Sequence, residues 1–380
     1  MANLTALRDH NTAAVLGRIR TAGSSAAGPS AAGSSAAGAI SQVELAAATG
    51  LTAQAVSKIV QRLTAEGLIA PSGRGPSTGG KPRTLLRLVP QARWVVGAQL
   101  DRHRLTLLLV DLCGQVADAV TLPVEQLDGP QPVLDLLAEQ VGALLAAVPR
   151  DHVLGVGVAC PGPLDQRTGV LHRVTGLPGW DGISLRAEVS ARIGLPVVVD
   201  KDTTAGVLGQ PGSADRAFVY LGDGLGAGLV LGGRVQRGAR TNAGEFGHQL
   251  ADPRGPLCAC GNRGCLEALC RAALDAGDQD RAADLLGEGV ANLVRLLDLD
   301  EVVLGGRAVL AAPELYRARI TALLRDRLPD PDWQQVAVSV AEAGQQAVPL
   351  GAAGLVLGPL FGAGEALSPA PVPHVGRSDM

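Results

Sequence analysis

One histidine and three cysteines lie close together in the second half of the chain: His248, Cys258, Cys260 and Cys265. Three thiolates and one imidazole make a full tetrahedral ligand set for a structural Zn²⁺, and the glycines among them allow the backbone to fold tightly around an ion. Cys270 is a possible spare ligand. A chance cluster of reduced thiols is the alternative, but three cysteines between residues 258 and 265 favour a metal site.

A second group of chemically informative residues lies near the N-terminus, in a segment with the periodicity of a helix. Its apolar residues are spaced to face a core: Val56, Ile59, Val60 and Leu63. The amides and cations between them face outward, as in a recognition helix that enters the major groove of DNA. The DNA-binding candidates in and beside this helix are Thr52, Gln54, Ser57, Lys58, Gln61 and Arg62.

The elements around this helix complete a winged helix-turn-helix pattern. Ser41 and Glu44 have the spacing of a capping box, so a helix begins there, and Gly50 provides the turn that ends it. Thr52 can cap the recognition helix. Residues 73–80, followed by Lys81 and Arg83, are typical of a basic wing. A purely structural helical hairpin would show the same apolar pattern, but the turn and the basic wing favour DNA binding.

The charge is distributed unevenly along the chain. Residues 1–90 hold 9 Lys and Arg against 3 Asp and Glu, a net charge of +6, whereas the remainder carries −9 within the total of −3. A basic N-terminal module is expected to meet a polyanion, with ordinary variation of surface charge as the alternative. Apolar runs such as residues 105–110 are too short to span a bilayer. The N-terminus has no signal-peptide core, so we expect a cytoplasmic protein without a membrane partner.

The sequence pattern of the rest of the chain predicts an α/β protein. A first helix is expected over residues 4–19, and residues 22–39, almost entirely Ala, Gly and Ser, are expected to form a flexible insertion. After Pro90 the pattern predicts strands separated by glycine turns and amphipathic helices. These strands are expected in two groups, hence two lobes with a cleft between them: residues 95–98, 105–111, 153–158, 197–200, 217–221, 228–231 and 301–304.

Three motifs of this region resemble those of the ROK family, which contains repressors, open reading frames and sugar kinases. They are the stretch Ala243 to His248, the stretch Cys258 to Glu267 and the triplet Leu304, Gly305 and Gly306. The resemblance implies an actin/hexokinase-like duplicated fold in two lobes, preceded by the winged helix-turn-helix domain. It also implies a zinc ion held by His248 and the three cysteines, and a sugar bound in the cleft between the lobes.

The resemblance further implies which residues contact the sugar: Asp202, Glu245, His248 and Glu267. Carboxylates accept hydrogen bonds from paired hydroxyls, and a zinc-bound histidine can present its other ring nitrogen to a ligand. Asp202 matches the family's catalytic base, which in a regulator need only accept a hydrogen bond. For Glu245 and Glu267 the alternative is that they only hydrogen-bond the zinc loop.

Two departures from the family pattern weaken the prediction of an enzyme. Residues 99–104 stand where ROK kinases carry an Asp followed by a Gly-Gly-Thr phosphate loop, and Asp101 adds a charge that would repel phosphate. In the second glycine-rich segment, residues 222–228, Asp223 stands at the family's usual Thr position. We therefore expect no catalytic residue and no kinase activity.

Two further departures lie in the expected sugar site. Lys201 stands where the family has an Asn beside the catalytic Asp, and Gly176 stands where it has an Asn before a Gly-Trp pair. Lys201 could receive a phosphate or carboxylate of the ligand, or it could pair with Asp200 or Asp202 and occlude the pocket. The identity of the sugar, and whether it is phosphorylated, is therefore left open.

These observations predict a transcriptional regulator with a DNA-binding domain at residues 1–90, a zinc-containing ROK sugar-binding domain at residues 91–362 and a mobile tail at residues 363–380. We expect a repressor of carbohydrate metabolism that forms a homodimer or homotetramer and binds operator DNA under the control of a sugar or sugar-phosphate effector. A sugar kinase with a DNA-binding appendage is the second hypothesis. A regulator that senses a partner protein is the third.

Overall fold

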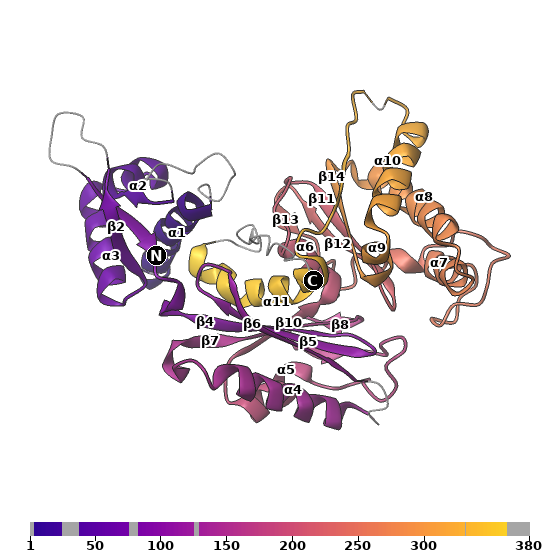
Figure 1. Ribbon diagram of the computed structural model, residues 1–380, viewed down its shortest axis with the longest axis horizontal. Coiled ribbons are helices and arrows are strands. Elements are labelled where there is room, and N and C mark those ends of the chain that lie inside the picture. The colour runs from indigo at the N-terminus through magenta and orange to yellow at the C-terminus, as the bar shows by residue number, and fades with distance from the viewer. Residues whose placement is uncertain (1–3, 25–37, 76–82, 125–128, 331, 363–380) are drawn as a thin grey trace, which may run out of the picture.

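The computed structural model describes residues 4–24, 38–75, 83–124, 129–330 and 332–362, arranged as an N-terminal domain followed by two lobes (Figure 1). None of the described helices is long and apolar enough to cross a membrane. The N-terminal domain contains α1 (Leu4–Ser24), α2 (Gln42–Thr49) and α3 (Ala53–Ala65), with a small antiparallel sheet in the order β1 (Ile40–Ser41), β3 (Thr84–Leu88) and β2 (Ile69–Arg74).

The caps expected in this domain are confirmed. The Ser41 backbone N–H donates to Glu44 Oε2 at 2.8 Å, and the Glu44 N–H donates to Ser41 Oγ at 3.4 Å. Gly50 ends α2 with a φ of 70°, and the Thr52 hydroxyl caps α3. The expected start of the insertion is wrong, because α1 continues to Ser24 and alanine is a strong helix former. The rest of the insertion, residues 25–37, the wing residues 76–82 and the tail at 363–380 lie outside the described residues.

The first lobe is built on a five-stranded sheet in the order β10, β7, β4, β5, β6. The antiparallel strands β4, β5 and β6 form a meander, β7 pairs with β4 in parallel, and β10 pairs with β7 in parallel. Helices α4 (Pro130–Leu145) and α5 (Leu185–Ile193) cover one face of the sheet (Figure 1). The strands are β4 (Trp94–Leu100), β5 (Arg104–Asp111), β6 (Val116–Pro123), β7 (Val153–Cys160) and β10 (Val197–Lys201).

The second lobe repeats this topology. Its sheet has the order β13, β12, β11, β14, β15, again an antiparallel meander extended by two parallel strands. Its strands are β11 (Arg216–Leu221), β12 (Leu225–Leu231), β13 (Arg234–Val235), β14 (Glu301–Gly305) and β15 (Ala337–Val340), and its helices are α7 (Leu266–Asp275), α8 (Gln279–Leu297), α9 (Arg307–Ala311) and α10 (Pro313–Arg327). The duplicated fold and all seven predicted strands are therefore confirmed. Short pieces complete the chain: η1 (Pro90–Ala92), η2 (Arg150–His152), β8 (Leu164–Asp165), β9 (Val170–Leu171), η3 (Phe246–His248) and η4 (Gly344–Gln346).

Two apolar helices, α6 (Asp202–Leu208) and α11 (Ala347–Leu357), cross between the lobes (Figure 1). Glycine allows their backbones to touch: a Cβ at Gly351 of α11 would lie 1.7 Å from the Ala205 carbonyl oxygen of α6. Helix α11 lies equally close to the first sheet, since a Cβ at Gly157 would lie 1.9 Å from the Ala352 carbonyl oxygen. Any side chain at these positions would force the elements apart.

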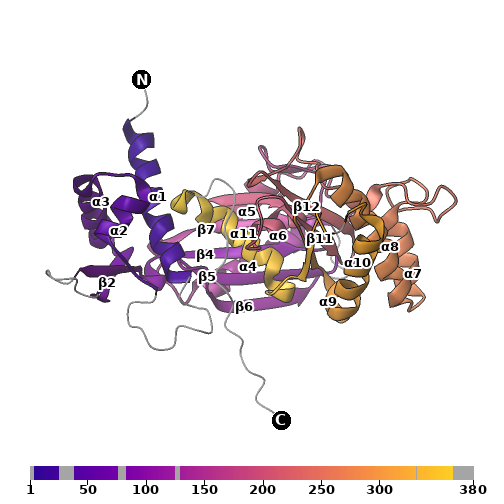
Figure 2. The same cartoon turned by 90° about the horizontal axis from the view of Figure 1, so that it is seen from above.

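The N-terminal domain shares a hydrophobic core with the first lobe. Helix α1 packs against η5 (Gly358–Phe361), the short helix that continues α11 (Figure 2). The Arg20 guanidinium lies 4.5 Å from the centre of the Phe361 ring. Buried residues of both parts form one cluster that includes Leu16, Leu88, Val110 and Leu357. The hydrophobic packing is therefore continuous across residue 90, the expected boundary between the two domains.

The crossing of α6 and α11 gives the first prediction. Gly351→Ala should lower the free energy of unfolding by about 1–3 kcal/mol, because its Cβ overlaps the Ala205 carbonyl oxygen. The matched control is Gly142→Ala in α4, where nothing lies within 4 Å of the new Cβ, and it should stabilise by about 0.5–1 kcal/mol. Chemical denaturation of both variants measures the difference. Equal stabilisation by both substitutions would contradict the contact.

Candidate functional site

A polar cavity of about 330 Å³ lies between the two lobes. Its size is at the lower end of the range for small-molecule pockets. All five residues predicted to contact a sugar line it: Lys201, Asp202, Glu245, His248 and Glu267. They come from the end of β10, the start of α6, the loop that contains η3 and the start of α7. The structure thus brings together residues separated by more than sixty positions in sequence.

Asp202 is the first residue of α6, and its Oδ1 accepts the Thr203 N–H at 2.7 Å. Burial, and next the negative charge of Asp101, raise the pKa of this carboxyl to about 7. The neighbouring Thr203 is 3% exposed, and its hydroxyl has no hydrogen-bond partner among the described residues. A buried hydroxyl without a partner at the wall of a cavity indicates a position for a polar ligand atom.

The Lys201 ammonium pairs with Glu245 rather than with Asp200 or Asp202. Its Nζ lies 2.5 Å from Glu245 Oε1, with the lysine side chain only 4% exposed, and Asp200 pairs instead with Arg237 at 2.8 Å. Of the two alternatives left open for Lys201, an ion pair with Asp200 or Asp202 is therefore wrong. The reason is the direction of the side chain, which passes over Gly162 toward the loop of Glu245. The lysine charge is compensated within the cavity wall.

Glu267 is buried, and its Oε2 accepts the Leu225 N–H at 2.7 Å. This bond ties the start of α7 to the start of β12. Glu245 accepts a hydrogen bond from Lys201, so neither this bond nor that of Glu267 supports the alternative that the two carboxylates only hydrogen-bond the loop of the cysteines.

The His248, Cys258, Cys260 and Cys265 side chains form one cluster, with their ligand atoms all within 4.8 Å of one another. The Cys260 and Cys265 sulfurs are 3.7 Å apart, and Cys258 Sγ is 3.7 Å from His248 Nδ1. Two sulfurs of a tetrahedral site with bonds of about 2.3 Å would be about 3.8 Å apart, so the donor set fits a metal ion. His248 Nε2 is turned toward Glu245 Oε2, 4.0 Å away, on the side of the cavity.

The remaining cysteines lie outside this cluster. Cys160 is buried in β7, where burial raises the pKa of its thiol. Cys270 is buried in α7 and its Sγ contacts the Ala282 carbonyl oxygen, so it is not a spare ligand. Cys113 is half-buried after β5, and burial raises the pKa of its thiol to about 11. Cys113 and Cys160 are therefore small packing residues against the apolar cores rather than members of the cluster.

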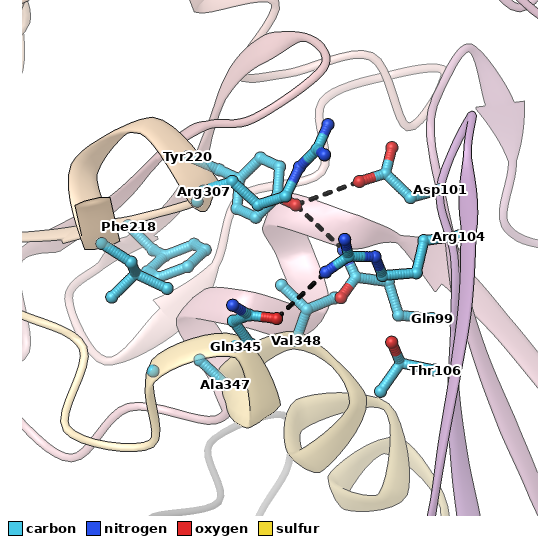
Figure 3. A pocket seen from close by; sticks show the side chains of 13 residues that line it. Gln99, Asp101, Arg104, Thr106, Phe218, Tyr220, Arg307, Gln345, Ala347 and Val348 are labelled. Atoms are coloured by element: carbon cyan, nitrogen blue, oxygen red, sulfur yellow. Dashed lines mark hydrogen bonds between the residues drawn. The ribbon is translucent and has the colours of Figure 1, made fainter. Parts of the chain in front are cut away.

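Sequence reasoning missed a polar network that joins the lobes beside the cavity (Figure 3). Tyr220 of β11 donates to Asp101 Oδ2 at 3.2 Å and accepts from Gln99 Nε2 at 3.3 Å. Arg104 donates to Gln345 Oε1 at 3.1 Å. The cavity among these side chains measures about 30 Å³, room for about one water. Their spacing in sequence carries no signal, because they meet only when the lobes do.

A second set of contacts holds the turn between β11 and β12. Asp223 accepts from three arginines: Arg307 reaches its carboxylate, and Arg102 and Arg271 reach its carbonyl oxygen. The bond from Arg102 is 2.7 Å and crosses from the first lobe to the second. Asp101, Arg102, Arg173 and Tyr220 also line the large cavity, though none was predicted as a site residue.

The predicted DNA-binding residues lie mostly on the exposed side of α3. Gln54, Lys58 and Gln61 are exposed and Ser57 is half-exposed, whereas Val56, Val60 and Leu63 are buried and Ile59 is partly buried. The Thr52 hydroxyl is used as the cap of α3. Arg62 hydrogen-bonds Thr12 of α1 and lies 3.8 Å from Glu66. Arg83 is exposed at the base of the wing, and Lys81 lies outside the described residues.

The family model described as "ROK family" matches residues 95–276 and 273–358, more than half of the chain. The chain belongs to the ROK family. A second model, described as "MarR family", matches residues 34–75 of the N-terminal domain. The family and the combined winged-helix and ROK architecture predicted from the sequence are thereby confirmed.

Curated relatives of this ROK protein include two named xylose repressors. That of Caldicellulosiruptor bescii is 24% identical over 367 residues, covering 84% of this chain and 92% of the relative. That of Bacillus subtilis is 28% identical over 269 residues, covering 68% of this chain and 69% of the relative.

Solved structures similar to this ROK protein include both regulators and kinases. A ROK family transcriptional regulator, described as a homologue of the E. coli MLC protein, has a TM-score of 0.74 and 22% identity and covers 94% of this chain and 97% of its own. The ROK hexokinase from Thermus thermophilus has a TM-score of 0.57 and 32% identity and covers 68% and 96%. The regulator therefore shares the whole architecture, and the kinase shares the two lobes.

The cysteine cluster predicts a metal ion in this ROK protein. Elemental analysis of the purified chain should give one ion per molecule, and Cys260→Ser should lose it. Loss of a structural metal can unfold a small subdomain, so the variant should also unfold at a lower temperature. Cys270→Ser, outside the cluster, is the control and should retain the ion. A wild-type chain without stoichiometric metal would contradict this prediction.

The raised pKa of Asp202 predicts that the stability of the folded chain depends on pH. Its pKa is raised to about 7 in the folded chain, against about 3.9 when unfolded, so the folded state keeps a proton that the unfolded state loses. The free energy of unfolding should therefore fall by about 3 kcal/mol as the pH rises from about 4 to about 7. Asp202→Asn should remove this fall and stabilise the chain at pH 8 more than at pH 4. Denaturation at both pH values is the measurement, and an equal effect at both would exclude this titration.

Proposed function

We propose that this ROK protein is a DNA-binding transcriptional repressor of carbohydrate metabolism whose operator affinity responds to a sugar. The observation that carries the proposal is that the domain exposing the polar side of α3 shares one hydrophobic core with a lobe that forms a wall of the carboxylate-lined cavity. A ligand that moves the lobes can thereby move the DNA-binding surface. The similarity to xylose repressors and to a ROK transcriptional regulator supports the same function.

In this proposal residues 1–90 bind the operator. Helix α3 enters the major groove with Gln54, Ser57, Lys58 and Gln61 toward the base edges and phosphates, and the wing residues Lys81 and Arg83 contact the backbone. Thr52 positions the start of the helix. Because Arg62 already bonds Thr12, its role is to hold α3 against α1 as much as to contact phosphate.

The sugar occupies the cavity, within a ligand-binding domain of residues 91–362. Asp202 and Glu245 accept hydrogen bonds from its hydroxyls, Glu267 orders the β12 end of the wall, and His248 Nε2 faces the ligand side. Lys201 neutralises Glu245 rather than receiving an anion, which favours an uncharged sugar over a sugar phosphate. The unpartnered Thr203 hydroxyl would bond another sugar oxygen.

The metal in the cysteine cluster is proposed to be a structural Zn²⁺. Three thiolates and a histidine complete the coordination of zinc without an open position, so the ion supplies folding energy rather than chemistry. By holding His248 Nδ1, it would keep the other ring nitrogen directed at Glu245 and the cavity. The sugar wall would therefore lose its shape without the metal.

Phosphoryl transfer is not part of the proposed function. Catalysis of this reaction consists mostly of positioning and stabilising phosphates. Here the first turn has Asp101 and Arg102 in place of glycines, the second turn has Asp223 bound by arginines, and the adjacent cavity measures only about 30 Å³. A sugar kinase remains the second candidate, favoured by the Asp202 carboxyl at the cavity wall and by the similarity to a hexokinase.

A repressor of this kind would act as a homodimer or homotetramer in the cytoplasm, since a two-fold protein matches an operator with dyad symmetry. A regulator that senses a partner protein instead of a sugar is distinguished by the absence of any sugar effect.

The proposal predicts two separable classes of variant. Lys58→Ala should weaken operator binding and lower the salt slope by about one, while leaving sugar affinity unchanged. Glu245→Gln should weaken sugar binding and leave operator binding intact but unresponsive, because a ligand without differential affinity shifts no equilibrium. Gln is chosen over Ala because Glu245→Ala would leave the buried Lys201 charge without a partner.

Fluorescence anisotropy with operator DNA, across salt concentrations, measures these effects with D-xylose, D-glucose, N-acetyl-D-glucosamine and the 6-phosphates of the latter two. Reciprocity requires operator DNA to change sugar affinity by the same factor, typically about 5- to 150-fold. Arg325→Ala, which removes an exposed charge from α10, is the control for Lys58→Ala. If no compound alters wild-type operator affinity, the sugar-responsive repressor is overturned. A phosphorylated sugar formed from ATP by the wild type but not by Asp202→Asn would establish the kinase instead.

A further inference from the structure

Arg102 joins the two lobes at the edge of the sugar cavity. It lies in the turn between β4 and β5, and its half-buried side chain lines the cavity together with Asp202 and Glu245. Its guanidinium donates to the Asp223 carbonyl oxygen of the second lobe at 2.7 Å. The turns of Arg102 and Asp223 are topological equivalents, since each joins the first two strands of its own sheet. One side chain therefore bridges the two matching turns across the cleft.

The slot that holds this guanidinium is formed by glycine. A Cβ at Gly176 would lie 2.7 Å from Arg102 Nε and 3.1 Å from its Cζ. A Cβ at Gly224, on the opposite lobe, would lie 3.4 Å from one terminal nitrogen of the same group. A side chain at residue 176 would therefore displace Arg102, so the position of the guanidinium depends on this glycine.

Most N–H donors of the Arg102 guanidinium have no partner among the described residues. Among the described residues Arg102 makes no ion pair, whereas Lys201 in the same cavity is paired with Glu245. One bond to a carbonyl oxygen uses one of its five N–H donors. The cavity wall also carries Asp101, Asp202, Glu245 and Glu267, so a phosphate placed there would face several carboxylates. An uncharged polyol can accept from Arg102 and donate to the carboxylates at the same time.

We propose that Arg102 is a ligand-contacting specificity residue that couples an uncharged sugar to closure of the two lobes. The inference rests on the proposed sugar-binding function and adds the residue and the ligand class. When the sugar is bound, the planar guanidinium donates to its ring or hydroxyl oxygens while keeping its bond to Asp223. The sugar thereby strengthens a bridge between the lobes, and the closed arrangement gains affinity for the ligand.

The first test needs no ligand. Hydrogen exchange of the amides between Gly222 and Gly226 reports on the turn that Arg102 holds. Arg102→Ala and Gly176→Asn should both accelerate this exchange by about fivefold or more, since each removes the bridge. Gly182→Asn is the matched control: its φ of +79° is close to the +81° of Gly176, and nothing lies within 4 Å of its new Cβ. Unchanged exchange in both test variants would overturn the bridge.

The second test measures affinity by calorimetry with D-xylose, D-glucose, N-acetyl-D-glucosamine and the 6-phosphates of the latter two. Arg102→Ala and Gly176→Asn should each weaken binding of the uncharged sugar by about 10- to 100-fold, and Gly182→Asn should not. Arg102→Lys should not restore binding, because lysine lacks the planar fork. The double variant Arg102→Ala/Gly176→Asn should be no weaker than either single variant, since both act on one guanidinium.

The outcomes separate this inference from the proposed function. A wild-type chain that binds an uncharged sugar, with Arg102→Ala binding equally well, overturns the inference and leaves the function intact. Binding of a 6-phosphate in preference to its parent sugar overturns the assigned ligand class. A wild-type chain that binds none of the compounds overturns the proposed function, and the exchange measurement then decides the bridge by itself.

Discussion

The contact of backbone on backbone between α6 and α11 is the constraint on which the rest of the molecule depends. Glycine at residue 351 lets α11 touch the carbonyl groups of α6, and glycine at residue 157 lets the first sheet touch α11 from the other side. Helix α6 begins with Asp202 at the cavity, and α11 continues into η5 against the N-terminal domain. The ligand wall and the DNA-binding surface are thus built on two helices in direct contact, which is the physical basis for coupling them.

The cavity stabilises its buried charges by local pairing. Lys201 is nearly inaccessible, but Glu245 lies within hydrogen-bond distance, and Asp200 is matched by Arg237. Asp202 forms no ion pair within the described part of the chain, and burial and the charge of Asp101 raise its pKa to about 7. Because burying polar groups without full compensation is costly, we expect a ligand to meet Asp202 and the Thr203 hydroxyl, which has no hydrogen-bond partner among the described residues.

The same fold serves kinases and regulators because function depends on a few turns. The turns after β4 and β11 face each other across the cleft, and in this chain arginine and aspartate side chains occupy them. Beside them, the Tyr220 hydroxyl of the second lobe donates to Asp101 of the first lobe, so side chains join the lobes directly (Figure 3).

Much of this architecture was predictable from local sequence. The capping box at Ser41 and Glu44, the periodicity of α3, the cluster of one histidine and three cysteines and the strands of both sheets all depend on residues near one another in the chain. The family resemblance pointed to Asp202 and Glu267, which line the cavity. Edge strands such as β6 and β15 were missed because they are half-exposed and weakly apolar. The partner of Lys201, the place of Arg102 over Gly176 and the core shared by α1 and α11 were decided only by the tertiary structure. These contacts join segments distant in sequence, and side-chain direction across an interface has no local signature, so the sequence determined the parts and the packing determined how they are connected.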